Sequence, residues 1–338
     1  MYADDVVILS ENHNELQEML NAVTEYGRDF NVRLSKEKSQ VLVVNGDDSD
    51  ADRIWMVGGN EIKRTKEYKY LGIWLDDKGC EKTQHERIAR ANQWVGRLGS
   101  VARCRANKYE VVRGLWKGVA VPSIMHGLET MVWSRKESDR LEVTQNKAGR
   151  IALGANRYVA VEAIRGDMGW STFRERIAKA GLRNRARLQR MDDSKWASKV
   201  WDWNMYEKWM KDSVKVEKWT GELGMFMTGV MRHGSMAVCK KEINRRVEEK
   251  GKEEWLRGMS EKSTLEWYRK KDQPRNERFY DSGYGGDLLF RARKKSLEVN
   301  SRMYRWKNGG SKVCVMCVTG VDETVEHLML VVVVVVEG

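Results

Sequence analysis

Residues 2–10, Tyr-Ala-Asp-Asp-Val-Val-Ile-Leu-Ser, contain the feature from which the rest of the chain can be interpreted. Asp4 and Asp5 are adjacent carboxylates that stand between an aromatic residue and an apolar run. Like charges this close repel each other unless a cation lies against them, and Mg²⁺ prefers hard oxygen ligands of this kind. The pair is therefore a candidate divalent-metal site, although adjacent aspartates also occur in solvated turns.

Downstream of this box, the first 80 residues combine apolar strands with one amphipathic helix. Asn12 with Glu15 three positions later is typical of a helix start, and apolar residues then recur at helical spacing up to Phe30. Gly58-Gly59 between apolar runs indicates a hairpin. We therefore expect an α+β fold, with a buried strand at 5–10, a helix at about 14–30, a strand at 41–44, a hairpin across 54–62 and a strand at 68–75.

The remainder of the chain is predicted to be mainly α-helical, and only two prolines among 338 residues allow long helices. The strongest helical segments are predicted at about 108–133, 137–153, 171–191 and 240–257. Polar or glycine-containing breaks are candidate joints between them, near Gly166-Asp167, Asp192-Asp193 and Asp281–Gly286.

A further predicted helix, after Gly79-Cys80, has two distinct faces. Its apolar stripe consists of Ile88, Ala91, Val95, Leu98 and Ala102. The neighbouring row is basic with one aromatic residue and consists of Arg87, Arg90, Trp94 and Arg97. We expect this row to be a nucleic-acid-binding face that follows a phosphate backbone, and the alternative is an ordinary solvated helix face.

Charge divides the chain at the same place. Residues 1–80 carry 10 basic and 16 acidic side chains, whereas the remaining residues carry 51 and 33. The cationic excess, +12 for the whole chain, favours a polyanionic partner such as nucleic acid. Five cysteines, an odd number with one close pair, argue against a disulfide framework and favour a reducing compartment.

The order of these motifs resembles that of reverse transcriptases, and more narrowly those of non-LTR (LINE-type) retrotransposons. Tyr2–Asp5 resembles palm motif C of that family. Residues 34–39, Leu-Ser-Lys-Glu-Lys-Ser, are similar to the end of motif D, with Ser35 in place of the usual Asn. Lys69–Ile73 is similar to the primer-grip hairpin, and the later helices, with the stretch Pro122–Glu129, look like the thumb and the LINE-type region beyond it.

The resemblance implies an RNA-directed DNA polymerase that works by two-metal nucleotidyl transfer with Mg²⁺. Its partners would be an RNA template, a DNA primer or target and deoxynucleotide triphosphates. Asp4 would be the principal metal ligand of this motif and Asp5 a weaker one. Lys38 would lie near the incoming triphosphate and donate a proton to the leaving pyrophosphate, unless it is simply a surface lysine.

Two further expectations follow from the resemblance. The primer end would be positioned by Tyr70, Leu71 and Gly72, unless these residues are an ordinary strand core. The expected organisation is a partial palm at 1–79, a thumb-like helical region at 80–190, a basic helical region at 191–310 and a degenerate zinc knuckle with a valine tail at 311–338.

The family also has fingers, a motif A with its own metal-binding Asp, and a motif B. All of these precede motif C, and no residue of this sequence corresponds to them. We therefore expect a chain of these 338 residues to be unable to polymerise, because a two-metal site that lacks a ligand loses most of its catalysis.

The C-terminal segment contains a second motif. Cys314-x2-Cys317 places two thiolates for one tetrahedral Zn²⁺, and His327 supplies a third ligand. Many LINE-type enzymes end with a similar Cys-Cys-His-Cys knuckle, but the valines of 331–336 occupy the expected position of its last Cys, near 332. The motif is consistent with weak Zn²⁺ binding completed by water, or with a degenerate knuckle that keeps free thiols.

Two alternatives stay open beside the polymerase, namely a non-catalytic nucleic-acid-binding fragment and a pseudogene product without a selected role. No signal peptide opens the chain, and its longest apolar run, Leu328–Val336, is too short to span a bilayer. We expect an intracellular protein without a membrane partner, and the family resemblance adds the nucleus and cytoplasm as its location.

Overall fold

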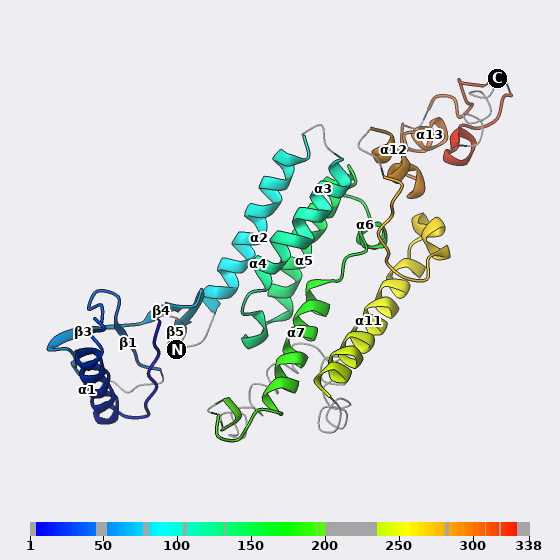
Figure 1. Cartoon of the computed structure of the whole chain (residues 1–338). Helices are drawn as coiled ribbons and strands as arrows, with labels where there is room; N and C mark the ends of the chain where they lie inside the picture. The colour runs from blue at the N-terminus through cyan, green and yellow to red at the C-terminus, as the bar shows by residue number, and fades with distance from the viewer. Residues whose placement is uncertain are drawn as a thin grey trace. The chain divides into compact units, whose positions relative to one another are not determined.

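In the computed structural model, strands occur before residue 77 and helices dominate after residue 80, which confirms the predicted α+β class. The structure describes residues 5–44, 53–76, 81–103, 107–131, 133–195, 197–199, 235–280, 284–307, 309–317 and 319–329. It divides into an N-terminal unit, residues 1–86, and a helical unit, residues 87–338 (Figure 1).

The N-terminal unit is built from one helix and a small sheet. Helix α1 (His13–Asp29) starts as predicted, because the Asn12 side chain accepts a 2.8 Å hydrogen bond from the backbone N–H of Glu15. Strands β1 (Gln40–Leu42), β2 (Trp55–Val57) and β3 (Asn60–Thr65) form a sheet of order β1-β3-β2, parallel between β1 and β3 and antiparallel between β2 and β3.

Helix α1 packs on this sheet through an apolar core and one polar pair. The core consists of Leu20, Val41, Trp55, Val57 and Ile62. The Gln17 amide both donates to and accepts from the backbone of Met56, each at 2.9 Å. The predicted hairpin is confirmed, because Gly58 and Gly59 have φ values of 56° and 78°, the conformation that tight hairpin turns require.

The strand expected at residues 5–10 is wrong. Val6, Val7 and Leu9 are 49%, 43% and 81% exposed, and only Ile8 packs against the core of the unit. A buried strand needs a neighbour that pairs with its backbone, and no named strand of the described residues pairs with 6–10.

The single strand expected at 68–75 is also wrong, because these residues form a hairpin. Strands β4 (Glu67–Tyr70) and β5 (Ile73–Asp76) pair in antiparallel fashion around a two-residue turn at Leu71 and Gly72. Both turn residues have positive φ, at 48° and 81°. An apolar run reads as one strand in sequence even where two residues reverse its direction.

The helical unit begins within α2 (Glu81–Val101). From residue 108 it continues as a second, bent helical stretch. Helix α3 (Lys108–Leu115) passes through a π-helical turn, η2 (Trp116–Ala120), into α4 (Val121–Met125). A π-turn before Pro122 fits a residue that lacks an N–H and crowds the preceding turn. The helix predicted to reach 133 ends at residue 125, since Gly127 has a φ of 76° and only a 3₁₀ turn, η3 (Leu128–Thr130), follows.

The other predicted helices are confirmed with shifted ends. They are α5 (Arg135–Ala152), α7 (Phe173–Leu188) and α11 (Met236–Ser260). A short helix, α6 (Val161–Met168), lies between α5 and α7. Three shorter elements follow α11, namely η4 (Ser263–Lys270), α12 (Tyr284–Arg293) and α13 (Asn300–Lys307). Helices α7 and α11 lie side by side (Figure 1), and Ala178, Leu182, Ile243 and Val247 are in the core between them.

The joint expected near Gly166-Asp167 lies two residues further on, since α6 ends at Met168 and Gly169 has a φ of 61°. Gly166 and Asp167 themselves lie inside α6, and Asp167 is fully buried. Its carboxylate accepts hydrogen bonds from the phenols of Tyr268 and Tyr280 and pairs with Arg293 at 2.9 Å and Lys271 at 3.2 Å. Burial and the Asp167 charge raise the pKa of both phenols above the usual value, so both remain donors. One carboxylate therefore joins α6 to η4, α12 and the segment between them.

No helix in the described part of the chain is both long and apolar enough to cross a membrane.

Asp167→Asn is expected to lower the free energy of unfolding of the helical unit by about 3 kcal/mol, because it removes the fully buried carboxylate that Lys271 and Arg293 share and leaves Glu277 as their remaining counter-ion. Urea denaturation followed by far-UV circular dichroism measures the change. Asp272→Asn is the matched control, since Asp272 is 66% exposed in a pair with Arg275 and should change stability by less than about 0.5 kcal/mol. Equal losses in both variants would show that the buried network does not stabilise the unit.

Candidate functional site

The motif C box lies at the margin of the described chain. Asp5 is exposed, and Asp4 lies outside the described residues. Among the described residues, no group of three or more His, Cys, Asp or Glu that could hold a metal includes Asp5. The Mg²⁺ role of Asp4 and Asp5 therefore stays a prediction.

Lys38 is exposed on a turn that two serines hold. The N–H of Ser39 donates to the carbonyl of Ser35 at 3.0 Å, and the Ser39 hydroxyl donates to the same oxygen at 2.8 Å. The phenol of Tyr68, on β4, donates to the Lys38 carbonyl at 3.2 Å. The structure thus brings the Ser35–Ser39 turn, predicted to be the end of motif D, against the hairpin predicted to be the primer grip, while the catalytic role of Lys38 stays a prediction.

The primer-grip hairpin presents Leu71 and Gly72 at its tip. Leu71 is 38% exposed and has a φ of 48°, a conformation that costs a residue with a β-carbon about 1–2 kcal/mol. The hairpin is fixed close to its turn, because the Thr83 hydroxyl bonds to both the N–H and the carbonyl of Trp74, at 2.7 and 3.1 Å. A strained, exposed apolar residue on a braced turn is the kind of feature found where a ligand is positioned.

The row predicted to bind nucleic acid lies on the side of α2 that meets α4. Arg87 is 1% exposed, so its side chain is not at the surface. Arg90 and Trp94 are half-buried and bond to Ser123, at 3.5 and 3.2 Å, and Arg97 is exposed with its guanidinium 5.0 Å from the Trp94 ring. Only the last part of the row is open to a phosphate backbone, and its role stays a prediction.

A basic groove that the sequence analysis missed lies between α2 and α5. It has a volume of about 820 Å³ and is lined by Ile88, Asn92, Arg135, Lys136, Asp139, Arg140, Val143, Thr144 and Lys147. The only acidic residue among these, Asp139, pairs with Arg174. The basic residues recur at helical spacing on α5, a signal present in the sequence but obscured by the overall charge of that segment.

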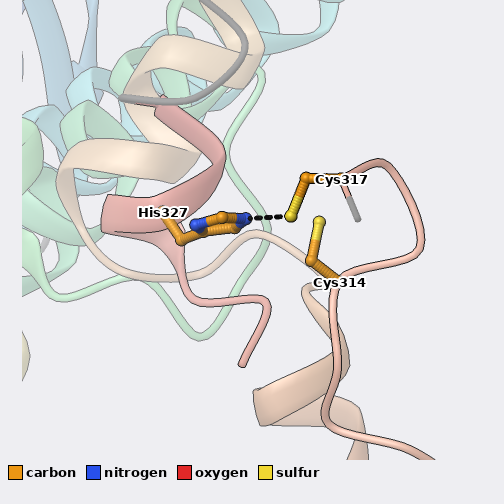
Figure 2. A group of neighbouring side chains, drawn as sticks. All are labelled: Cys314, Cys317 and His327. Atoms are coloured by element: carbon orange, nitrogen blue, oxygen red, sulfur yellow. Dashed lines mark hydrogen bonds between the residues drawn. The ribbon is translucent and has the colours of Figure 1, made fainter. Parts of the chain in front are cut away.

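The Cys and His residues of the C-terminal motif come together as predicted. Their ligand atoms lie within 4.8 Å of one another, and the Cys317 Sγ is 3.2 Å from the His327 Nε2. Figure 2 shows the two cysteines on one loop and His327 on the opposite short helix, residues 325–329. The loop is closed by a bond from the Cys314 N–H to the Val321 carbonyl at 2.9 Å.

This cluster fits one Zn²⁺ bound by three protein ligands. The span between the ligand atoms is close to what a single ion with bonds of about 2.0–2.3 Å bridges. Hydrogen bonds from Thr319 first, and from His327 and Cys314, lower the pKa of the Cys317 thiol to about 7, and the thiolate is the form that binds metal. The expected fourth position, near 332, lies outside the described residues.

Comparison with known proteins gives the family of the N-terminal unit. Residues 1–75 match the family model described as reverse transcriptase (RNA-dependent DNA polymerase). These residues belong to the reverse transcriptase family. The matched range contains the motif C box, the Lys38 turn and the hairpin through β5, so the predicted resemblance is confirmed.

The similarity to curated proteins extends into the helical unit. The chain is 24% identical over 183 residues to the RNA-directed DNA polymerase from mobile element jockey of Drosophila melanogaster, a match that covers 49% of this chain and 19% of that protein. It is 25% identical over 202 residues to the jockey protein of Drosophila funebris, covering 55% of this chain and 21% of that protein. The matches thus span about a fifth of the length of these relatives and support a LINE-type reverse transcriptase. No solved structure matches the chain significantly.

The chain is expected to bind one Zn²⁺ at the Cys/His cluster, and Cys314→Ser should abolish this binding because it removes a ligand atom. Chelator competition measures the affinity. Cys239→Ser is the control, since Cys239 is buried between α7 and α11 away from the cluster. Val332→Cys should tighten binding by completing four ligands. Zinc binding that survives Cys314→Ser would contradict the site.

Proposed function

We propose that the chain is part of the RNA-directed DNA polymerase of a non-LTR retrotransposon and that its helical unit binds the nucleic acid on which the polymerase acts. The observation that carries the polymerase assignment is the family match over residues 1–75. The observations that support nucleic-acid binding are the groove between α2 and α5 and the cationic excess after residue 80.

The proposed chemistry assigns separate roles to three parts of the N-terminal unit. Mg²⁺ held in part by Asp4 and Asp5 would stabilise the charge that develops on the transferred phosphate. Lys38 is exposed on its braced turn, so its ammonium can reach a pyrophosphate leaving group and protonate it. The Leu71-Gly72 turn projects from the fixed hairpin and would hold the primer end.

A chain of these 338 residues is expected to bind a primer–template without extending it. The resemblance assigns a further catalytic aspartate to motif A, and a two-metal site without that ligand should retain little activity. The test is a primer-extension assay with Mg²⁺ and labelled nucleotides, beside a binding measurement on the same primer–template. Mg²⁺-dependent incorporation that Asp4→Asn abolishes would contradict the expected inactivity and would show that this chain holds a complete site.

The groove makes nucleic-acid binding without catalysis a specific second candidate. Lys136, Arg140 and Lys147 are exposed along one face of α5, and no described carboxylate pairs with them. The exposed Val143 lies among them, so the groove offers cations beside an apolar surface. Cations at helical spacing beside an apolar surface suit a phosphate backbone with its sugars.

The double variant Lys136→Gln/Arg140→Gln is expected to weaken binding of a labelled oligonucleotide and to reduce the slope of log K against log salt by about 2, because each cation contacts one phosphate. Fluorescence anisotropy across a salt series measures both quantities. The matched control is Lys240→Gln/Lys241→Gln, which removes the same charge from exposed positions on α11. Equal effects of the two double variants would show that only net charge matters and would reject the groove.

A further inference from the structure

A group of four cations lies where α5, α12 and α13 meet. Lys294, directly after α12, is only 9% exposed. Arg291 stands one helical turn before it on α12, and Arg302 of α13 donates to the carbonyl of Lys295 at 3.5 Å. Arg150, in the last turn of α5, is the third arginine whose charge acts on Lys294.

Packing between α12 and the end of α5 brings these cations together. The Asp287 carboxylate of α12 lies against Gly154, just after α5, so closely that a β-carbon at Gly154 would be 2.2 Å from it. Asp287 also pairs with Lys108 through both oxygens, at 2.6 and 2.7 Å. This contact places α12 beside the turn of α5 that carries Arg150.

Glu298 is the carboxylate closest in sequence to the group, four residues from both Lys294 and Arg302, and it is exposed. The next nearest carboxylates are engaged elsewhere. Asp287 is bound to Lys108, Glu323 accepts from the backbone and side chain of Asn300, and Glu326 pairs with Lys295. Burial first, and then Arg302, Arg291 and Arg150, lower the pKa of Lys294 to about 8.

This arrangement costs stability in the folded chain. An ammonium on a side chain that is only 9% exposed, with three guanidinium groups acting on it, loses part of its hydration, and no ion pair in the described part of the chain compensates it. Lys294 has no hydrogen-bond or ion-pair partner among the described residues. A cluster of this kind is favourable only when an anion with several acceptor oxygens, such as a phosphate group, binds to it.

An exposed aromatic side chain continues the cluster on α13. Trp306 is 77% exposed, and the Arg302 guanidinium lies 5.5 Å from its ring centroid. Tyr304 is 39% exposed, with the Lys312 ammonium 4.6 Å from its ring. Arg302 therefore connects the segment just after α12, through its bond to the Lys295 carbonyl, with an indole face that is open to solvent.

We infer that the junction of α12 and α13 binds a single-stranded segment of nucleic acid, with a backbone phosphate on Arg291, Lys294 and Arg302 and an unpaired base stacked on Trp306. The inference rests on the proposed function and deepens it by naming the form of nucleic acid that this site accepts. A cationic cluster joined to an exposed aromatic face is how single strands are bound without sequence preference. Bases paired inside a duplex cannot stack on Trp306.

The first test measures binding of a labelled single-stranded oligonucleotide to the full chain by anisotropy. Trp306→Ala is expected to weaken binding about tenfold, which corresponds to one lost stacking contact, and Trp306→Phe is expected to retain most of the affinity. Tyr158→Ala is the matched control, because Tyr158 is 79% exposed and also lies under a guanidinium, that of Arg157 at 4.7 Å. An equal loss in both alanine variants, or no loss in Trp306→Ala, would overturn the stacking site.

The second test separates a binding role of Lys294 from a structural one. Lys294→Met is expected to weaken oligonucleotide binding about threefold to tenfold and to raise the thermal midpoint of the free chain, because it removes an uncompensated buried charge. Lys270→Gln, which removes one charge from an exposed position at the end of η4, should change neither quantity appreciably. A lowered thermal midpoint with unchanged binding would overturn the phosphate site.

Two further arms identify the ligand. A blunt duplex of the same length should bind equally well to the wild type and to Trp306→Ala. If Trp306→Ala loses as much affinity for the duplex as for the single strand, the single-strand preference is rejected. Inorganic phosphate at constant ionic strength should leave oligonucleotide affinity within about twofold, and displacement by phosphate alone would identify a free-anion site instead. If the wild type binds the oligonucleotide and no variant changes the affinity, only this inference is rejected. If the chain binds no oligonucleotide at all, the proposed function is rejected as well.

Discussion

The buried carboxylate of Asp167 is the interaction on which the arrangement of the helical unit depends. It is fully buried on α6 and contacts Tyr268 of η4, Tyr280, and Arg293 of α12. A charge removed from water in this way is tolerated only when cations and donors satisfy it, so these segments must lie where they do. Arg293 and Lys294 are neighbours, and successive residues of a helix point about 100° apart. Arg293 pairs with Asp167, whereas Lys294, the next residue, belongs to the separate group of cations with Arg150 of α5.

Local sequence rules predicted a feature correctly wherever the residues that determine it are close in sequence. The Asn12 cap, the Gly58-Gly59 turn and the Cys/His cluster were predicted, because each is set by residues within a short segment. The buried role of Asp167 could not be predicted, since Tyr268 and Arg293 follow it by 101 and 126 residues. In the sequence, Gly166-Asp167 therefore looked like a joint between helices. The row that includes Arg87 was identified as basic, but its burial depends on packing that helical periodicity does not contain.

The two units suit different parts of one reaction. The acidic N-terminal unit matches the reverse transcriptase family and presents the Lys38 turn and the strained Leu71 on a braced hairpin. The basic helical unit presents the groove along α5 and, at the other end of that helix, the cation cluster near Arg150. In the proposed account the first unit carries polymerase chemistry, and the second holds the nucleic-acid strand.

Hydrogen exchange with and without a single-stranded oligonucleotide tests this account most directly. Binding should slow amide exchange in residues 135–147 of α5 and across α12 and α13, with α7 and α11 unchanged because their shared face is already buried. Slower exchange confined to residues 5–76, or no change anywhere in the helical unit, would contradict the claim that this unit holds the strand.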